Sequence, residues 1–223
     1  FKTPVYSKSY KKSALVVTFT HTKSHNDTAF EIFYKNGPLA ILPMKKNKGA
    51  FASSIVWTNE KNFLSNLIQD DNKNLIPTLS RETQNCVGEI KNIISRQIFD
   101  LNAHLNSRFF ENRTIYIGDA AHSFHPIAGQ GWNLGMKDVE NLYKLLSSYK
   151  SLGIDPGDSF FCKKYHDENY YNAYRLYQIT DKLDSIFQIQ NTAFKFARSS
   201  GLNIINKNQK IKDLISDFAM GFN

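Results

Sequence analysis

The sequence predicts an α+β fold, and three observations support this class. The first hundred residues contain several short segments rich in β-branched and aromatic side chains, separated by turn signals. A short apolar strand, a glycine-containing loop and a helix follow between residues 113 and 146. The rest reads as helical. With 41% hydrophobic and 13% aromatic residues, the chain can bury a core, which excludes general disorder.

The N-terminal part is expected to form a meander of antiparallel strands. The turn signal Asn36–Gly37 precedes one of these strands, and a polar loop over 45–49 precedes the next. Strands are predicted over 13–21, 28–34, 39–42 and 51–57.

A short helix is predicted to open at Thr58–Glu60, because Phe63, Leu64, Leu67 and Ile68 follow at helical spacing. The polar residues 69–78 are read as a break, with Pro77 as a helix breaker. For 92–101, strand and helix remain equally open.

The pattern changes at residue 112. A strand is predicted over 113–119, and a helix follows the loop, with one apolar face that the core should cover. Further helices are predicted over about 158–180 and 181–198. The face of the first helix comprises Trp132, Met136, Val139, Tyr143 and Leu146, and a last amphipathic helix presents Ile211, Leu214, Ile215 and Phe218.

The net charge of +8 is concentrated in residues 1–50, which contain nine Lys and two acidic residues. Sequence-specific nucleic-acid readers depend on Arg, and only six of the 28 basic residues are Arg. The excess is therefore read first as a solvated face, with an anionic membrane surface and then nucleic acid as the alternatives. Cys86 and Cys162 form no metal-binding pattern and no disulfide framework, which fits a reducing compartment.

The stretch from Gly118 to Asp138 carries the chemistry that the sequence suggests. A strand ending at Asp119 would deliver a carboxylate to the carboxyl edge of a sheet, where ligands bind in open α/β folds. Gly129 and Gly131 let backbone N–H groups face outward, and the helix that begins there directs its positive dipole end at the ligand. Such a site suits a ligand that carries hydroxyl groups and develops negative charge.

This stretch resembles the second flavin-binding signature, GDAAHxxxPxxGQGxNxGxxD, of the FAD-dependent aromatic hydroxylases related to p-hydroxybenzoate hydroxylase. Within that superfamily it is most similar to the ubiquinone-biosynthesis hydroxylases of the 2-octaprenyl-6-methoxyphenol hydroxylase group, whose pattern HPIAGQGxNLGxxD matches residues 125–138. Every fixed position of the first signature is filled: Gly118, Asp119, Ala120, Ala121, His122, Pro126, Gly129, Gln130, Gly131, Asn133, Gly135 and Asp138.

The resemblance extends over nearly the whole chain and corresponds to the C-terminal portion of a family member. The GxGxxG motif that such a protein carries near its start does not occur, and the first residue is Phe1. We therefore expect a portion of a longer protein, which by itself should bind flavin weakly because the pyrophosphate-binding loop is missing.

The resemblance implies three regions. Residues 1–108 would form part of the antiparallel sheet of a substrate domain. Residues 109–150 would supply the C-terminal strand, loop and helix of a Rossmann-like FAD-binding α/β domain, and residues 151–223 would form a helical tail.

The same resemblance implies the contacts with FAD. Asp119 would accept hydrogen bonds from ribityl or ribose hydroxyls, with capping of the following turn as the alternative. Pro126 would lie against the edge of the flavin ring, while Gly118, Gly129 and Gln130 would shape the loop. The backbone at Gly131, Trp132 and Asn133 would face the N1/C2 carbonyl region, where the reduced ring accumulates negative charge.

No catalytic side chain is assigned, because the reaction of this family needs no protein nucleophile. His122 and His125 are expected to hydrogen-bond loop carbonyls, with proton handling near the substrate phenol as the alternative. Their spacing alone makes no metal site.

The implied function is an FAD-dependent monooxygenase that hydroxylates a polyprenylated phenol in bacterial ubiquinone biosynthesis. NAD(P)H would reduce the flavin, O2 would form a flavin C4a-hydroperoxide, and one oxygen atom would reach the ring. A related hydroxylase with a small soluble substrate and a non-catalytic assembly subunit remain alternatives. The expected partner is a ubiquinone-biosynthesis complex. No binding of nucleic acid is expected. The expected location is the cytoplasm, peripheral on the inner face of the membrane.

Overall fold

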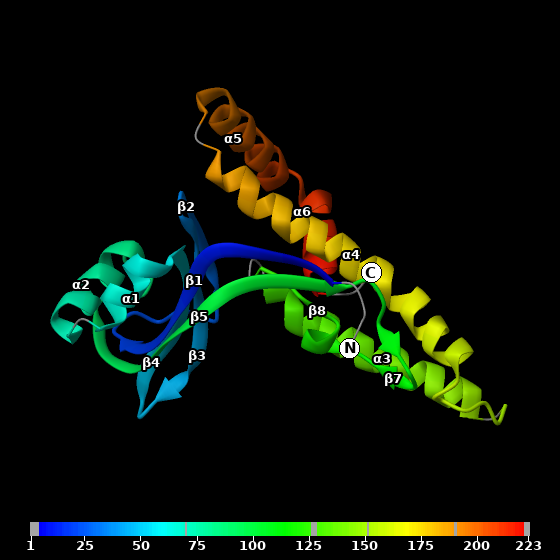
Figure 1. Ribbon diagram of the computed structural model, residues 1–223. Coiled ribbons are helices and arrows are strands. Elements are labelled where there is room, and N and C mark those ends of the chain that lie inside the picture. The colour runs from blue at the N-terminus through cyan, green and yellow to red at the C-terminus, as the bar shows by residue number, and fades with distance from the viewer. Residues whose placement is uncertain (1–4, 70, 126–128, 151, 190, 221–223) are drawn as a thin grey trace. The chain divides into compact units, whose positions relative to one another are not determined.

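Antiparallel strands and helices together build the computed structural model, which confirms the predicted α+β class (Figure 1). It describes residues 5–69, 71–125, 129–150, 152–189 and 191–220. These residues form two compact units, one from Ser9 to Leu101 and one comprising the remaining described residues. The three-region division implied by the family resemblance stays a prediction.

One antiparallel sheet has the strand order β2-β3-β4-β1-β5-β8, where β8 is the short strand His122–Ser123. The meander prediction is confirmed for β2, β3 and β4, whereas β1 pairs with β4, Val17 lying opposite Ile55. The loop predicted over 45–49 is shorter than expected, because β3 extends through Asn47. The strands are β1 (Val5–His21), β2 (Phe30–Tyr34), β3 (Gly37–Asn47), β4 (Ala50–Glu60) and β5 (Ile90–Asn106).

The core of the first unit lies between one face of this sheet and two helices, α1 (Lys61–Gln69) and α2 (Asn72–Glu82). Alternate residues of each strand face this core, as the two-residue period of a strand requires. The buried residues include Leu15, Val17 and Phe19 of β1, Leu39 and Ile41 of β3, Ile55 and Trp57 of β4, and Leu64, Leu67, Leu75 and Leu79 of the helices.

Two predicted boundaries in this unit are wrong. Thr58–Glu60 do not open a helix, because they continue β4 in register with β1. Residues 72–78 are not a break, because they belong to α2 with Pro77 inside it. A proline removes only one backbone hydrogen bond from this helix, and the burial of Leu75 and Leu79 compensates for that loss. The ambiguous segment 92–101 is strand β5.

The second unit begins with short strands, and the strand predicted over 113–119 is mostly absent from it. Only Thr114–Ile115 are strand (β7), in a hairpin with β6 (Phe110–Glu111). Residues Gly118–Ala120 form a 3-10 turn, η1, instead of continuing the strand. β8 (His122–Ser123) then pairs with the end of β5. Asp119 therefore lies on a turn, not at the end of a strand.

Helices α3 (Gln130–Lys150) and α4 (Ser159–Gln188) pack together and form the second core with Phe109, Phe161 and Tyr165. The apolar face predicted for α3 is wrong for four of its five residues, and only Leu146 packs against the core. Trp132 and Tyr143 are 77% and 70% exposed, and Met136 and Val139 are also exposed. The helix turns a different face toward η1 and α4, which consists of Leu134, Asp138, Leu142, Leu145 and Leu146.

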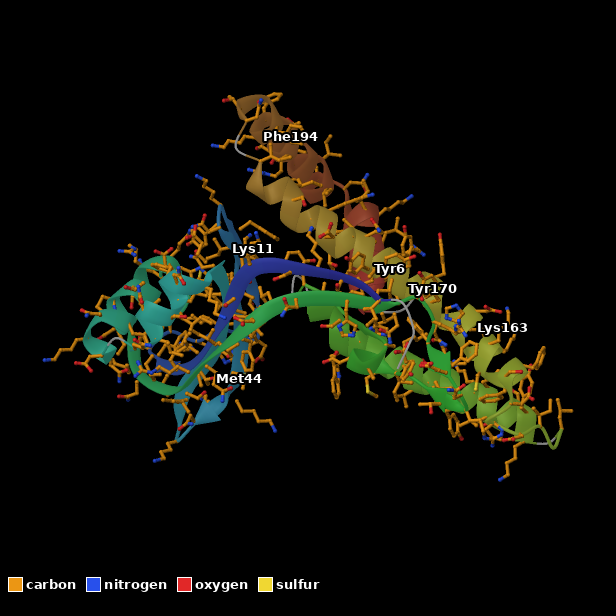
Figure 2. The ribbon with its side chains drawn as sticks, viewed as in Figure 1. Tyr6, Lys11, Met44, Lys163, Tyr170 and Phe194 are labelled. Carbon is orange, nitrogen blue, oxygen red and sulfur yellow. The ribbon has the colours of Figure 1, made fainter. Side chains whose placement is uncertain are left out.

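The tail contains α5 (Thr192–Lys207) and α6 (Gln209–Met220). The helix boundary predicted near 180 is wrong, because α4 continues to Gln188. The start of β1 lies along α4, where Lys8 pairs with Asp181 and Tyr6 lies near Tyr170; Figure 2 labels both tyrosines.

Candidate functional site

The turn that carries Asp119 is fixed on one side by the end of β5. His104 Nε2 lies 3.0 Å from the carbonyl oxygen of Asp119, and Asn106 Nδ2 donates to the carbonyl oxygen of Ala120 at 2.9 Å. The backbone amide of Asn106 also donates to Ala121 O at 2.9 Å. Three successive carbonyl groups of the turn are therefore bound to one strand.

Helix α3 fixes the same turn from another side. The backbone amide of Gly118 donates to Asp138 Oδ2 at 2.9 Å. Gly118 has φ +54°, a backbone conformation that favours glycine, and a Cβ on Gly135 would make an ordinary van der Waals contact with its Cα at 3.5 Å. Gly118 thus serves the conformation of this turn, which packs against α3.

His122 is part of this packing and has a different partner from the one predicted. Its Nε2 lies 2.8 Å from Asp138 Oδ2, and both side chains are 1% exposed. The expectation that it binds a loop carbonyl is wrong. Its ring stacks on Phe124 with centroids 5.1 Å apart. Burial, and then the negative charge of Asp138, raise the pKa of Tyr165 on α4.

The Asp119 carboxylate, in contrast, is exposed. None of the described residues hydrogen-bonds it, so the capping bond considered as an alternative is not seen among them. Because the backbone on both sides is fixed, this carboxylate is presented to a ligand from a rigid turn. A rigid acceptor loses little conformational freedom on binding.

The start of α3 lies next in the chain. Gly129 has φ +61°, and no atom of the described residues lies within 4 Å of the position where its Cβ would be. Gly131 belongs to the first helical turn and has no positive φ. A Cβ on Gly131 would likewise meet no described atom within 4 Å. Trp132 and Asn133 are exposed, whereas Gln130 is half-buried. Pro126 lies outside the described residues.

These features together fit the ligand that the sequence suggested. The first amides of a helix lack intrahelical acceptors and attract negative charge, and η1 packs against this same helix. The space beside Gly131 lets a flat group approach the backbone. The exposed carboxylate of Asp119, which can accept hydrogen bonds from hydroxyl groups, therefore lies on a turn that packs against α3, whose first amides can bind negative charge.

His104 and Asn106 are site residues that sequence reasoning missed. They are two residues apart and lie on the same face of β5, which is the spacing of a strand. This alternation is the feature of the sequence that could have identified them. It was not recognised, because the preceding segment 92–101 could be either strand or helix.

Comparisons with known proteins identify the family of this chain. A family described as "FAD binding domain" matches residues 2–153. The ubiquinone hydroxylase UbiL of Rhodospirillum rubrum is 32% identical over 95% of the chain and 48% of its own length. The human ubiquinone biosynthesis monooxygenase COQ6 is 26% identical over 95% of the chain and 52% of its own length. The chain thus spans about half the length of these relatives.

A solved structure supports the fold. The p-nitrophenol 4-monooxygenase PnpA from Pseudomonas putida superimposes with a TM-score of 0.72 over 98% of the chain and 54% of its own length, at 13% identity. The resemblance to ubiquinone-biosynthesis hydroxylases drawn from residues 118–138 is confirmed by the family match and by the relatives.

Proposed function

Because the chain belongs to the family of FAD-binding domains, we propose that it is part of an FAD-dependent monooxygenase that hydroxylates a polyprenylated phenol in ubiquinone biosynthesis. The names of its relatives support the pathway and the reaction class. The observation that carries the proposal is the exposed Asp119 carboxylate on its fixed turn beside α3.

In this proposal Asp119 accepts hydrogen bonds from ribityl or ribose hydroxyls of FAD. FAD, when bound and reduced by NAD(P)H, supplies the oxygen transfer to the aromatic ring. The chain supplies an acceptor on a turn whose backbone needs no reorganisation when the hydroxyls arrive. Gly118 contributes by allowing the left-handed turn that precedes this carboxylate.

The start of α3 would stabilise negative charge on the reduced ring. The backbone amides at Gly131, Trp132 and Asn133 would hold that ring, because the glycine leaves room for close approach. Gly129 and Gln130 shape the entry to the helix, and Pro126 is assigned to the ring edge on the family resemblance alone.

The phenol is assigned to the face of the sheet opposite α1 and α2. On this face Leu42 lies opposite Ser54, and Thr18 Oγ1 donates to Ser54 Oγ at 3.3 Å. Leu42 and Met44, the latter labelled in Figure 2, are 40% and 45% exposed. The exposed apolar side chains of Leu42 and Met44 suit a prenylated ring better than a small acid.

The proposed location is the cytoplasmic side of a membrane, with contact through the tail. Among the described helices, none is both long and apolar enough to cross a bilayer. A polyprenyl chain is nearly insoluble in water, so the enzyme must reach the bilayer surface or take its substrate from a biosynthetic complex. Helices α5 and α6 expose Phe194, Phe196, Leu202, Ile204, Leu214 and Ile215.

Titration of the full-length protein with FAD, followed by quenching of flavin fluorescence, tests the proposed site. Asp119→Ala should weaken FAD binding roughly tenfold to a hundredfold, because charge-assisted hydrogen bonds contribute about 1.5–3 kcal/mol. Asp71→Ala is the matched control, since that aspartate precedes α2 without a side-chain capping bond. Equal FAD affinity in all three proteins contradicts the assignment.

Turnover tests the substrate class. The flavin-loaded protein should consume NAD(P)H and O2 with a short-chain prenylated phenol and release a hydroxylated ring. Tight FAD binding without hydroxylation of any phenol favours an assembly subunit, and hydroxylation only of soluble phenols favours the related hydroxylase.

A further inference from the structure

We infer that Asp138 is the positioning residue of the Gly118–His122 turn, and that it sets the affinity for FAD by acting through Asp119. This inference rests on the proposed function. It assigns to a helix residue, which points away from solvent, a role in a binding event that takes place on the surface.

The geometry is that of one oxygen atom shared by two donors. Asp138 Oδ2 accepts from the Gly118 amide at 2.9 Å and is paired with His122 Nε2 at 2.8 Å. These donors lie at the two ends of a five-residue turn, and Asp119 lies between them. A single carboxylate oxygen on α3 therefore fixes both ends of the segment that presents the ligand-binding carboxylate.

Burial shows that this arrangement serves geometry more than stability. Asp138 is fully buried, and a carboxylate loses much of its solvation energy on transfer to an interior. Well-packed apolar residues commonly stabilise a core as well as a buried ionic pair does. The apolar contacts of α3 are already supplied by Leu142 and Leu145, so what the carboxylate adds is a fixed orientation of the turn.

The direction of the His122 hydrogen bond follows from its partner. Asp138 Oδ2 already accepts from the Gly118 amide, and in the same way it accepts from His122 Nε2. The other ring nitrogen, Nδ1, and Asp138 Oδ1 are buried and have no hydrogen-bond partner among the described residues. The ring therefore donates from one side only, and its contact with Phe124 fixes its plane.

A double-mutant cycle on FAD affinity tests this role in the full-length protein. Asp119→Ala and Asp138→Ala should each weaken FAD binding roughly tenfold to a hundredfold. The double variant should bind FAD at most about threefold more weakly than the single variant that has the lower affinity, because a positioning residue has little effect once its target is gone. If the losses of FAD affinity in the two single variants multiply in the double variant, the inference is overturned.

Two further variants separate positioning from loss of fold. Asp138→Asn keeps an acceptor oxygen of the same shape and should restore FAD affinity to within about tenfold of the wild type. Asn141→Ala, one turn further along α3, removes a 2.7 Å hydrogen bond to Asn169 on α4 and should lower the melting temperature without changing FAD affinity. If Asn141→Ala weakens FAD binding as much as Asp138→Ala does, general destabilisation explains both, and the inference fails.

The outcomes also separate this inference from the proposed function. If Asp119→Ala alone binds FAD like the wild type, both the flavin site and the role of Asp138 are overturned. If Asp119→Ala weakens binding and Asp138→Ala does not, the flavin site stands and only the role of Asp138 is wrong.

Discussion

His21 Nε2 lies 2.9 Å from Ser53 Oγ inside the first unit, and the direction of this hydrogen bond is fixed by a third group. His21 Nδ1 lies 2.9 Å from the carbonyl oxygen of Lys23, which can only accept, so Nδ1 carries the hydrogen. Nε2 of the neutral ring then accepts from the Ser53 hydroxyl. The rings of Phe19, His25 and Phe51 surround this imidazole.

Acidification should destabilise the protein through His21. Burial lowers the pKa of His21 below its ordinary value of 6.5; the carbonyl of Lys23 opposes this shift, and the nearby His25 adds to it. As the pH falls below about 6.5 the unfolded chain therefore takes up a proton first, and the free energy of unfolding decreases until the pH reaches the lower pKa of the folded state. Burial lowers the pKa of His166 in the second unit as well, with the same sign.

Urea unfolding at several pH values between 7.5 and 5 measures this dependence. His21→Gln should flatten the decrease, whereas Ser53→Ala, which removes the partner but keeps the titrating ring, should retain it. An unchanged slope in His21→Gln contradicts the assignment to this histidine.

Gly37→Ala should destabilise the sheet by about 2–4 kcal/mol. The alanine would have to adopt the positive φ that the glycine already has, and its Cβ would clash with a neighbouring strand. Gly37 has φ +143°, and its Cβ would lie 2.7 Å from the carbonyl oxygen of Thr58. Gly201→Ala is the control: the position is helical, with nothing within 4 Å of the new Cβ, so stability should rise by about 0.5–1 kcal/mol. Denaturant unfolding of both variants measures the difference. A Gly37→Ala protein as stable as the wild type shows that the strand start can shift.

Gly131→Val should leave the fold intact and weaken the binding of FAD. The position is helical, and a Cβ there meets no atom of the described residues within 4 Å, yet the valine holds a flat ring away from the amides of the first turn. Gly201→Val, the same substitution at a helical glycine of α5, is the control for the effect of the valine on stability. Melting temperature and FAD titration together separate the two effects, and wild-type affinity in Gly131→Val shows that the ring lies elsewhere.

The tail should bind lipid vesicles through its exposed apolar side chains. Phe196 and Leu214 are 76% and 63% exposed on α5 and α6. Sedimentation with neutral vesicles should retain the full-length protein at high salt, and Phe196→Ser with Leu214→Ser should release it. Retention that requires anionic lipid and disappears with salt indicates instead the lysines of residues 1–50. Absence of binding to either vesicle contradicts direct membrane contact and favours delivery of substrate by a partner complex.

Much of the first unit could be predicted from its sequence, because strand periodicity is a local property. The β-branched and apolar residues of 13–21, the alternation in 28–34 and the turn at Asn36–Gly37 correctly indicated strands. The errors occurred where pairing overrides local preference. Thr58–Glu60 resemble a helix start but remain in β4 because β1 supplies their hydrogen-bond partners.

The apolar face of α3 was predicted wrongly for a similar reason. A sequence shows that a helix has two faces, but which face is covered depends on the neighbouring elements. Here Asp138 lies on the covered face because Gly118 and His122 supply its donors, whereas Trp132 faces solvent.

The sequence by itself determined the α+β class and the identity of the flavin signature, because both depend on residue type and spacing within short windows. Only the tertiary structure decided that Asp119 lies on a turn, that His104 and Asn106 fix its backbone, and that Asp138 binds His122. These contacts join residues that are 14 to 16 positions apart in the chain. Such pairs are brought together by the packing of a strand and a helix on one turn, and no local pattern encodes that packing.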